Sequence, residues 1–333
     1  MKVISFLGFT NYQDTTYLNP VNGEGFTTRF FQEALVEFYK PEILYVLLTK
    51  TVETDIPRGA TETNWNSLQK LLAEKVDLQP IYNVPQANST ADIWQLFEML
   101  TNCLQEGDRV IFDITHSFRS LPVLALIAVS YLRVVKDVKI EGLIYGAFEA
   151  KNKETNETPT FDLLPMVSLL EWTTATDQFI KTGNGQALAS LLDNSNAQTH
   201  NLASSIDGIA RGLQLLRPMD VMREAAMLPD YIAQATPVVS RAVPPFAALL
   251  GRVEQDYGKF GLANPNDAKA SLLRQLEMVE WYAEKGQTVQ ALSMAREWLP
   301  SLLCYHFQLD PQIEKPNRSE MELLLAGGKL KDK

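Results

Sequence analysis

The residues best placed to do chemistry lie in a short run about a third of the way along the chain. They are Asp113, Thr115, His116, Ser117 and Arg119. The apolar residues before this run predict a buried strand, and those after it predict a helix. Free backbone N–H groups and the positive end of the helix dipole favour an anion at such a junction. The sequence therefore predicts an anion-binding site here.

The same run also has a purely structural interpretation. Asp113, Thr115 or Ser120 could cap the helix that follows, because short polar side chains accept hydrogen bonds from free N–H groups. A single histidine, His116, could be hydrogen-bonded structure. The local chemistry alone leaves both interpretations open.

The elements that must position this run alternate between strands and helices as far as about residue 137. Strands are expected at residues 3–9, 43–48, 78–84, 110–114 and 139–148. Helices are expected at residues 27–39, 64–76, 90–104 and 121–135. This alternation predicts a parallel, doubly wound sheet. Its ligand-binding loops would gather at the carboxyl ends of the strands, at residues 9–17, 49–58, 84–89 and 113–119. Residues 145–150 and 160–164 suggest an antiparallel hairpin at the edge.

The pattern changes after about Pro165, and no further strand is predicted. Helices are expected at residues 166–182, 185–193, 201–216, 220–235, 242–251, 266–285 and 288–306. The predicted fold class is an α/β Rossmann-like domain with a parallel sheet, over residues 1–165, followed by an all-α domain over residues 166–333. A length of 333 residues agrees with two domains.

Composition narrows the range of partners. The net charge of −10 gives no general attraction to duplex DNA, so we expect no such partner. Cys103 and Cys304 have no metal or redox spacing, and we expect buried, reduced thiols. No Gly-x-Gly-x-x-Gly, P-loop or zinc-ligand pattern is present, so no cofactor or metal is expected. Without a leader or a run of about 18 apolar residues, we expect a cytoplasmic protein with no membrane segment.

Five short motifs, taken together, resemble a known family. The run Asp113-Ile-Thr-His-Ser117 resembles the Asp-x-Thr-His-Gly motif of one branch of the CARF proteins, the CRISPR-associated Rossmann-fold family, with Ser117 in place of glycine. The other matches are residues 6–12 (Phe-Leu-Gly-Phe-Thr-Asn-Tyr) with Tyr17, residues 145–149 (Tyr-Gly-Ala-Phe-Glu), residues 170–173 (Leu-Glu-Trp-Thr) and residues 295–299 (Ala-Arg-Glu-Trp-Leu).

The resemblance implies an accessory protein of type III CRISPR immunity that senses cyclic oligoadenylate. The sensor domains would pair as a two-fold homodimer around one ring, with cyclic tetra-adenylate favoured over hexa-adenylate. The expected ligand-binding residues are Gly8, Phe9, Thr10, Asn11, Tyr12, Asp113, Thr115, His116, Ser117, Arg119, Tyr145 and Gly146. Phe9 or Tyr12 could stack on an adenine or could instead pack within the loop.

The carboxyl half resembles the helical HEPN ribonuclease domain, whose catalytic Arg precedes a His by four to six residues. Neither His200 nor His306 has such an arginine, and the Arg109–His116 spacing lies across the predicted strand. The apolar neighbours of His306 suggest that it lies in a packed helix. Three alternatives follow: a sensor without enzyme activity, a metal-free ring nuclease, and a ribonuclease whose end is missing. An RNA or protein partner of the helical half is also expected.

Overall fold

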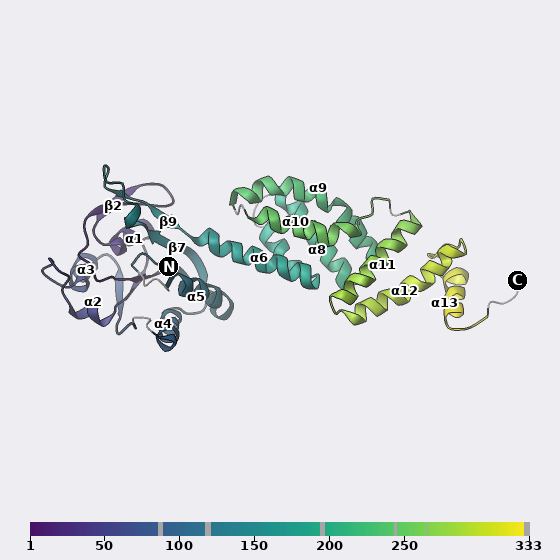
Figure 1. Cartoon of the computed structure of the whole chain (residues 1–333), viewed down its shortest axis with the longest axis horizontal. Coiled ribbons are helices and arrows are strands. Elements are labelled where there is room, and N and C mark those ends of the chain that lie inside the picture. The colour runs from purple at the N-terminus through teal and green to yellow at the C-terminus, as the bar shows by residue number, and fades with distance from the viewer. Residues whose placement is uncertain (86–88, 117–120, 194–196, 243–244, 265, 330–333) are drawn as a thin grey trace. The chain divides into compact units, whose positions relative to one another are not determined.

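The computed structural model describes residues 1–85, 89–116, 121–193, 197–242, 245–264 and 266–329. The chain divides into two compact units, residues 1–167 and 168–333 (Figure 1). Among the described residues, no helix is both long enough and apolar enough to cross a membrane.

The first unit is built on a six-stranded sheet with the strand order β5-β4-β1-β6-β7-β9. The strands are β1 (Lys2–Phe6), β4 (Ile43–Leu47), β5 (Asp77–Ile81), β6 (Arg109–Asp113), β7 (Lys139–Gly146) and β9 (Thr160–Asp162). Every pairing is parallel except that of β7 with β9, in which Gly146 lies opposite Thr160. The predicted fold class is therefore confirmed, and β7 and β9 form the antiparallel edge.

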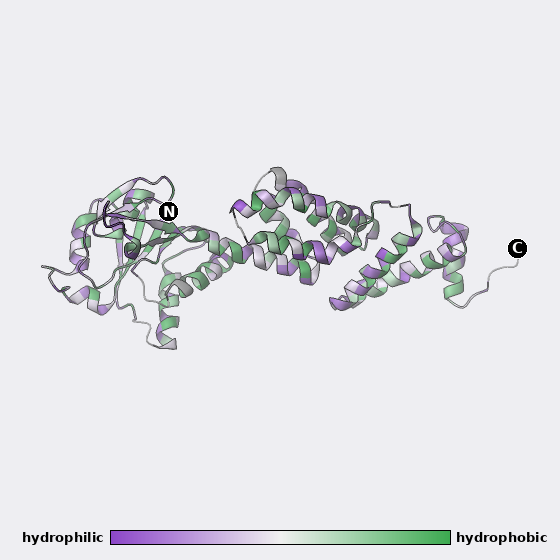
Figure 2. Ribbon diagram, turned by 45° about the horizontal axis from the view of Figure 1, so that its top comes forward, coloured by the Kyte–Doolittle hydropathy of each residue, from purple (hydrophilic) through white to green (hydrophobic). Residues whose placement is uncertain are grey.

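Helices cover both faces of this sheet because apolar side chains alternate along its strands. In β1, Val3 packs with α1 (Phe31–Tyr39) and α3 (Asn64–Leu72), and Ile4 packs with α4 (Thr90–Asn102) and α5 (Leu121–Lys136). A short helix, α2 (Lys50–Thr54), follows β4. Figure 2 shows the strands of this unit coloured mostly as apolar. The crossovers leave the carboxyl ends of β1 and β6 as neighbours.

A second, three-stranded sheet has the order β3-β2-β8. Its strands are β2 (Thr15–Leu18), β3 (Gly25–Thr28) and β8 (Glu157–Thr158). The prediction of a loop through residue 17 and a helix from residue 27 was wrong here. The strand β2 gains its partner from a distant segment: the hydroxyls of Thr15 and Thr158 lie 2.7 Å apart. Local periodicity cannot show such a partner.

The described part of the second unit is helical. Its helices are α6 (Leu164–Thr182), which begins in the first unit, α7 (Gln186–Asp193), α8 (Ala197–Gln214), α9 (Pro218–Ala242), α10 (Phe246–Tyr257), α11 (Ala268–Glu284), α12 (Thr288–His306) and α13 (Ser319–Leu325). Its core contains Phe179, stacked on Tyr257 with ring centroids 4.1 Å apart, and the buried Trp281. His306 lies at the end of α12, a helix that packs through Ala291, Met294 and Cys304, but its own side chain is exposed.

Both cysteines are free thiols, and burial raises the pKa of each. Cys304 is buried as expected, whereas Cys103 is only partly buried. The thiol of Cys103 donates a hydrogen bond of 3.1 Å to the carbonyl oxygen of Met99, within the same helical turn. A raised pKa keeps both groups as unreactive thiols at neutral pH.

Candidate functional site

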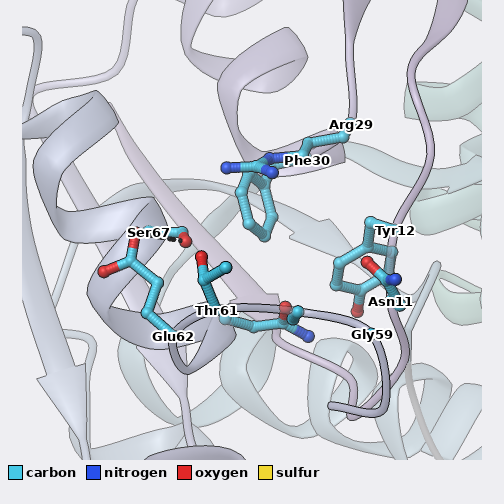
Figure 3. A pocket seen from close by; sticks show the side chains of 10 residues that line it. Asn11, Tyr12, Arg29, Phe30, Gly59, Thr61, Glu62 and Ser67 are labelled. Atoms are coloured by element: carbon cyan, nitrogen blue, oxygen red, sulfur yellow. Dashed lines mark hydrogen bonds between the residues drawn. The ribbon is translucent and has the colours of Figure 1, made fainter. Parts of the chain in front are cut away.

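A cavity of about 400 Å³ opens beside the carboxyl ends of β1 and β6. Its lining is Thr10, Asn11, Tyr12, Gln13, Tyr17, Arg29, His116, Phe148 and Glu149. A smaller cavity of about 160 Å³ shares Asn11, Tyr12 and Arg29 with it and extends toward α3, where Glu62, Asn64 and Ser67 line it (Figure 3). This position at the strand ends is where open α/β sheets bind ligands.

The loop that follows β1 is held in one shape by hydrogen bonds within and around it. The backbone N–H of Gly8 donates to the hydroxyl of Tyr12 at 2.8 Å. The side-chain amide of Asn64 donates to the carbonyl oxygens of Gly8, at 3.0 Å, and of Thr10, at 2.8 Å. A Cβ atom at Gly8 would lie only 2.6 Å from the Tyr12 hydroxyl oxygen, so this approach requires glycine. The loop therefore presents Tyr12 to the cavity in a fixed position.

His116 meets Tyr12 at the wall of the larger cavity. Their ring centroids lie 4.6 Å apart, and the far side of Tyr12 contacts Phe30 edge-on at 5.5 Å. Burial lowers the pKa of His116 to about 4, so its imidazole is neutral at pH 7. The Nε2 atom of His116 is buried and has no hydrogen-bond partner among the described residues. A buried polar atom of this kind is costly unless a ligand or water satisfies it.

Asp113 lies beneath the cavity, where it is fully buried and does not line it. Its carboxylate accepts hydrogen bonds from the Ser5 hydroxyl at 2.5 Å and from the Thr115 N–H at 2.8 Å. Burial raises the pKa of Asp113 to about 6 despite these hydrogen bonds. The Thr115 hydroxyl oxygen in turn accepts from the N–H of Gly146 at 2.8 Å. Asp113 and Thr115 thus fix the turn that carries His116.

The structure separates the predicted site residues by position. Those that line the cavity are Thr10, Asn11, Tyr12 and His116. Those that support it are Gly8, Asp113, Thr115 and Gly146. Phe9 is 42% exposed and does not belong to the lining. Tyr145 is not part of the lining: it packs against the core formed with α4 and α5, and its hydroxyl donates a hydrogen bond of 2.9 Å to the lining residue Glu149. Ser117 and Arg119 lie outside the described residues.

Five residues that line the larger cavity are not among the predicted site residues: Gln13, Tyr17, Arg29, Phe148 and Glu149. Arg29 is the only basic residue in the described lining of either cavity. Its guanidinium carbon lies 5.2 Å from the centroid of the Phe30 ring, and it makes no ion pair among the described residues. Figure 3 shows the Arg29 side chain next to Phe30. The sequence predicted a helix from residue 27 that includes Arg29. In the structure Arg29 directly follows β3, and this strand brings its side chain to the cavity. Phe148 and Glu149 belong to one of the five motifs, residues 145–149, and this motif was the sequence signal that could have identified them.

Both halves of the chain have matches among known proteins. Residues 2–149 match the family described as "CRISPR system endoribonuclease Csx1, CARF domain". Residues 168–267 match "CRISPR-associated protein MJ1674, second domain". A curated relative, the CRISPR-associated protein MJ1674 of Methanocaldococcus jannaschii, is 32% identical over 123 residues, which are 36% of this chain. The match covers 19% of that relative's length.

Among solved structures, Enterococcus italicus Csm6 bound to cyclic hexa-2'-fluoro-hexa-dAMP aligns with a TM-score of 0.48 and 10% sequence identity. The alignment covers 99% of this chain and 76% of that one. The family matches, by contrast, include the β1 loop, the β6 turn and the segment with Phe148 and Glu149 in a single stretch. Residues 2–149 are therefore similar to the CARF domain of CRISPR-associated proteins, and residues 168–267 are similar to the second domain of MJ1674.

Proposed function

We propose that the CARF-like segment of this chain is a sensor that binds cyclic oligoadenylate in the cavity at the ends of β1 and β6. The observation that carries this proposal is that Arg29 and His116 line the same 400 Å³ cavity, in a segment similar to CARF domains, and that the buried Nε2 atom of His116 has no hydrogen-bond partner among the described residues. A cyclic oligoadenylate offers phosphates to the cation and hydrogen-bonding groups to the imidazole. One class of ligand would therefore supply both an anion for the Arg29 guanidinium and a hydrogen-bond partner for the His116 imidazole.

The lining divides into groups with different roles toward such a ligand. The guanidinium of Arg29 pairs with a phosphate, and Thr10 and Asn11 offer a hydroxyl and an amide to phosphate or ribose oxygens. The neutral imidazole of His116 exchanges one hydrogen bond through Nε2. Phe148, which is 38% exposed, offers a ring face to an adenine. Tyr12 is held by Gly8, Phe30 and His116, so it serves as a fixed wall.

The proposed complex has one ring for two chains, with cyclic tetra-adenylate preferred over hexa-adenylate. A ring with two-fold symmetry presents the same groups to each of two copies of the cavity. Titration calorimetry with cyclic tetra-adenylate, cyclic hexa-adenylate and linear tetra-adenylate tests this. We expect heat from the cyclic ligands at a ratio of one ring to two chains. Binding at one ring per chain would overturn the shared site, and absence of any binding would overturn the proposed function.

Two enzyme activities are tested in the same samples: cleavage of the ring, and cleavage of RNA that the ring activates. Incubated samples are separated by chromatography to detect linear oligoadenylate, and single-stranded RNA is added to parallel samples. We expect the ring to remain intact and the RNA to remain uncut. The helical unit then acts through contacts with RNA or protein rather than through cleavage. In the described residues His200 pairs with Asp193 at 2.5 Å, and neither it nor His306 has an arginine at the HEPN spacing.

A further inference from the structure

The larger cavity contains a carboxylate as well as a cation. Glu149 is the only acidic residue in its described lining, and no ion pair joins it to Arg29 in the part of the chain that the structure describes. Opposite charges that share a cavity without pairing suit a ligand that carries an anion at one position and a hydrogen-bond donor at another. The phosphates of a cyclic oligoadenylate would pair with the guanidinium but would be repelled by the carboxylate. Glu149 therefore needs a donor from another part of the ligand.

The carboxylate of Glu149 is held in place from one side. The hydroxyl of Tyr145 donates a hydrogen bond of 2.9 Å to Oε2 of Glu149, and Tyr145 packs against the core formed with α4 and α5. The turn η1 (Phe148–Ala150) is fixed as well, because the N–H of Ala147 before it donates to the carbonyl oxygen of Pro159 at 2.9 Å. The Oε1 atom of Glu149 makes no hydrogen bond among the described residues, so one carboxylate oxygen is available to a ligand.

The neighbours of Glu149 show what a ligand would meet beside it. The negative charge of Glu149 opposes part of the fall that burial causes in the pKa of His116, so the carboxylate lies near that imidazole. Phe148 also lines the cavity, and the ammonium nitrogen of Lys151 lies 5.2 Å from the centroid of its ring. The cavity thus offers an aromatic ring for a base and, on the next residue, an acceptor for a group on the edge of that base.

A cyclic oligoadenylate has two kinds of donor, the N6 amino group of adenine and the 2′-hydroxyl of ribose. The ring of Phe148 favours the amino group, because a base stacked on that ring extends its edge past it, whereas the ribose lies outside the stack. We infer that Glu149 determines base specificity: its free oxygen accepts a hydrogen bond from the N6 amino group of an adenine stacked on Phe148. Tyr145 is the positioning residue that holds this acceptor. The inference rests on the proposed function and adds how the same cavity selects adenine.

The test compares two rings in titration calorimetry with the full chain. Cyclic tetra-adenylate and the corresponding ring of purine riboside carry the same phosphates, and the second lacks only the N6 amino group. The ratio of their dissociation constants therefore separates the base from the general electrostatics of the cavity. We expect wild type to bind the purine riboside ring about 10- to 100-fold more weakly, as for the loss of a hydrogen bond to a charged group. Glu149→Leu should bind the two rings about equally.

Two further variants control for charge and for position. Glu154→Leu removes an exposed carboxylate of the same segment that lies outside the lining of the cavity, and it should keep the wild-type ratio. Tyr145→Phe removes only the hydroxyl that holds Glu149, so its ratio should fall between those of wild type and Glu149→Leu. Circular dichroism checks that each variant is folded. A ratio in Glu149→Leu equal to that of wild type would overturn the inference.

A ring of 2′-deoxyadenosine distinguishes the second donor. We expect it to lose the same affinity, relative to cyclic tetra-adenylate, in wild type and in Glu149→Leu. If wild type discriminated against the deoxy ring and Glu149→Leu did not, Glu149 would face the ribose hydroxyl and the inference would be wrong. Rings that bind with a ratio independent of Glu149 would remove the inference and leave the proposed function standing. Absence of binding by every ring would remove both.

Discussion

The imidazole of His116 and the phenol ring of Tyr12 lie with their centroids 4.6 Å apart, although they follow different strands, β6 and β1. Each strand end contributes one wall of the same cavity, and Phe30 closes the far side of Tyr12. The contact also buries the His116 ring, which is why its pKa falls and the imidazole is neutral at pH 7. The proposed ligand site is thus formed by two loops, one after β1 and one after β6, rather than by a single sequence motif.

Replacing Arg29 should weaken ring binding without affecting folding. Arg29 is exposed and makes no ion pair among the described residues, so Arg29→Ala removes only its contact with the ligand and with the Phe30 ring. We expect ring binding to become weaker by about 1.5–3 kcal/mol, as for the loss of a hydrogen bond to a charged group. Arg109→Ala is the control, since Arg109 pairs with Glu141 at the amino end of β6. Titration calorimetry showing equal affinities for the two variants would contradict the role of Arg29.

A methyl group at Gly8 should displace Tyr12. The Cβ atom of Gly8→Ala would lie 2.6 Å from the Tyr12 hydroxyl oxygen, and Tyr12 must move because the loop is held by Asn64. We expect at least a tenfold loss of ring affinity, whereas Gly251→Ala, whose Cβ atom would meet nothing within 4 Å, should bind normally. Intrinsic tyrosine fluorescence and calorimetry together check this. Normal ring binding by Gly8→Ala would show that the position of Tyr12 does not matter.

The buried carboxyl group of Asp113 should make stability depend on pH. Its pKa is raised to about 6 in the folded protein, so the folded state binds a proton more tightly than the unfolded state. The stability contributed by the protonated group is fully present below about pH 4 and is lost as the pH rises through about 6. Relative to wild type, Asp113→Asn should therefore gain up to about 3 kcal/mol in free energy of unfolding between pH 4 and pH 6.5, since one pKa unit is worth about 1.4 kcal/mol.

His116 should show the opposite dependence in the same experiment. Its pKa is lowered to about 4 by burial, so the folded state excludes a proton that the unfolded state binds below about pH 6.5. Stability from the neutral imidazole therefore increases as the pH rises from about 4 to 6.5. Relative to wild type, His116→Gln should lose stability over that range. Urea unfolding at a series of pH values checks both variants. If the free energy of unfolding of a variant followed the same pH dependence as that of wild type, the burial of the replaced side chain would be contradicted.

The helical unit should not cleave RNA when the ring is bound. His306 is exposed at the end of α12, but no arginine of the described residues precedes it at the HEPN spacing. Arg318, the nearby basic residue, is already engaged by Glu297 at 2.6 Å and by Glu322 at 3.4 Å. A labelled single-stranded RNA incubated with protein and cyclic tetra-adenylate should remain intact. Cleavage that is abolished by His306→Ala and kept by His200→Ala would show that α12 carries a catalytic group.

Local sequence patterns were enough to predict the architecture of the central sheet and the presence of a helical second half. Apolar runs in β1, β4 and β6 and the periodicity of α12 are local signals, because each strand or helix must bury its own apolar face. The same reasoning located the turn after β6 and the loop after β1, whose residues Tyr12 and His116 meet in the structure. It also placed them at one edge, since parallel strands end together.

The remaining features depend on contacts between segments that are distant in the sequence. The small sheet forms because Thr15 meets Thr158, which no local pattern predicts, and this sheet leads Arg29 into the cavity. The helix α9 continues through Pro229 and Pro237, where the sequence predicted an earlier end, because Val239 and other residues of α9 pack in the helical core. Asp113 likewise supports the site from below instead of lining it, since Ser5 and Thr115 hold its carboxylate. Which polar residues face a ligand and which hold the fold is set by contacts between distant segments, and these exist only once the chain has folded.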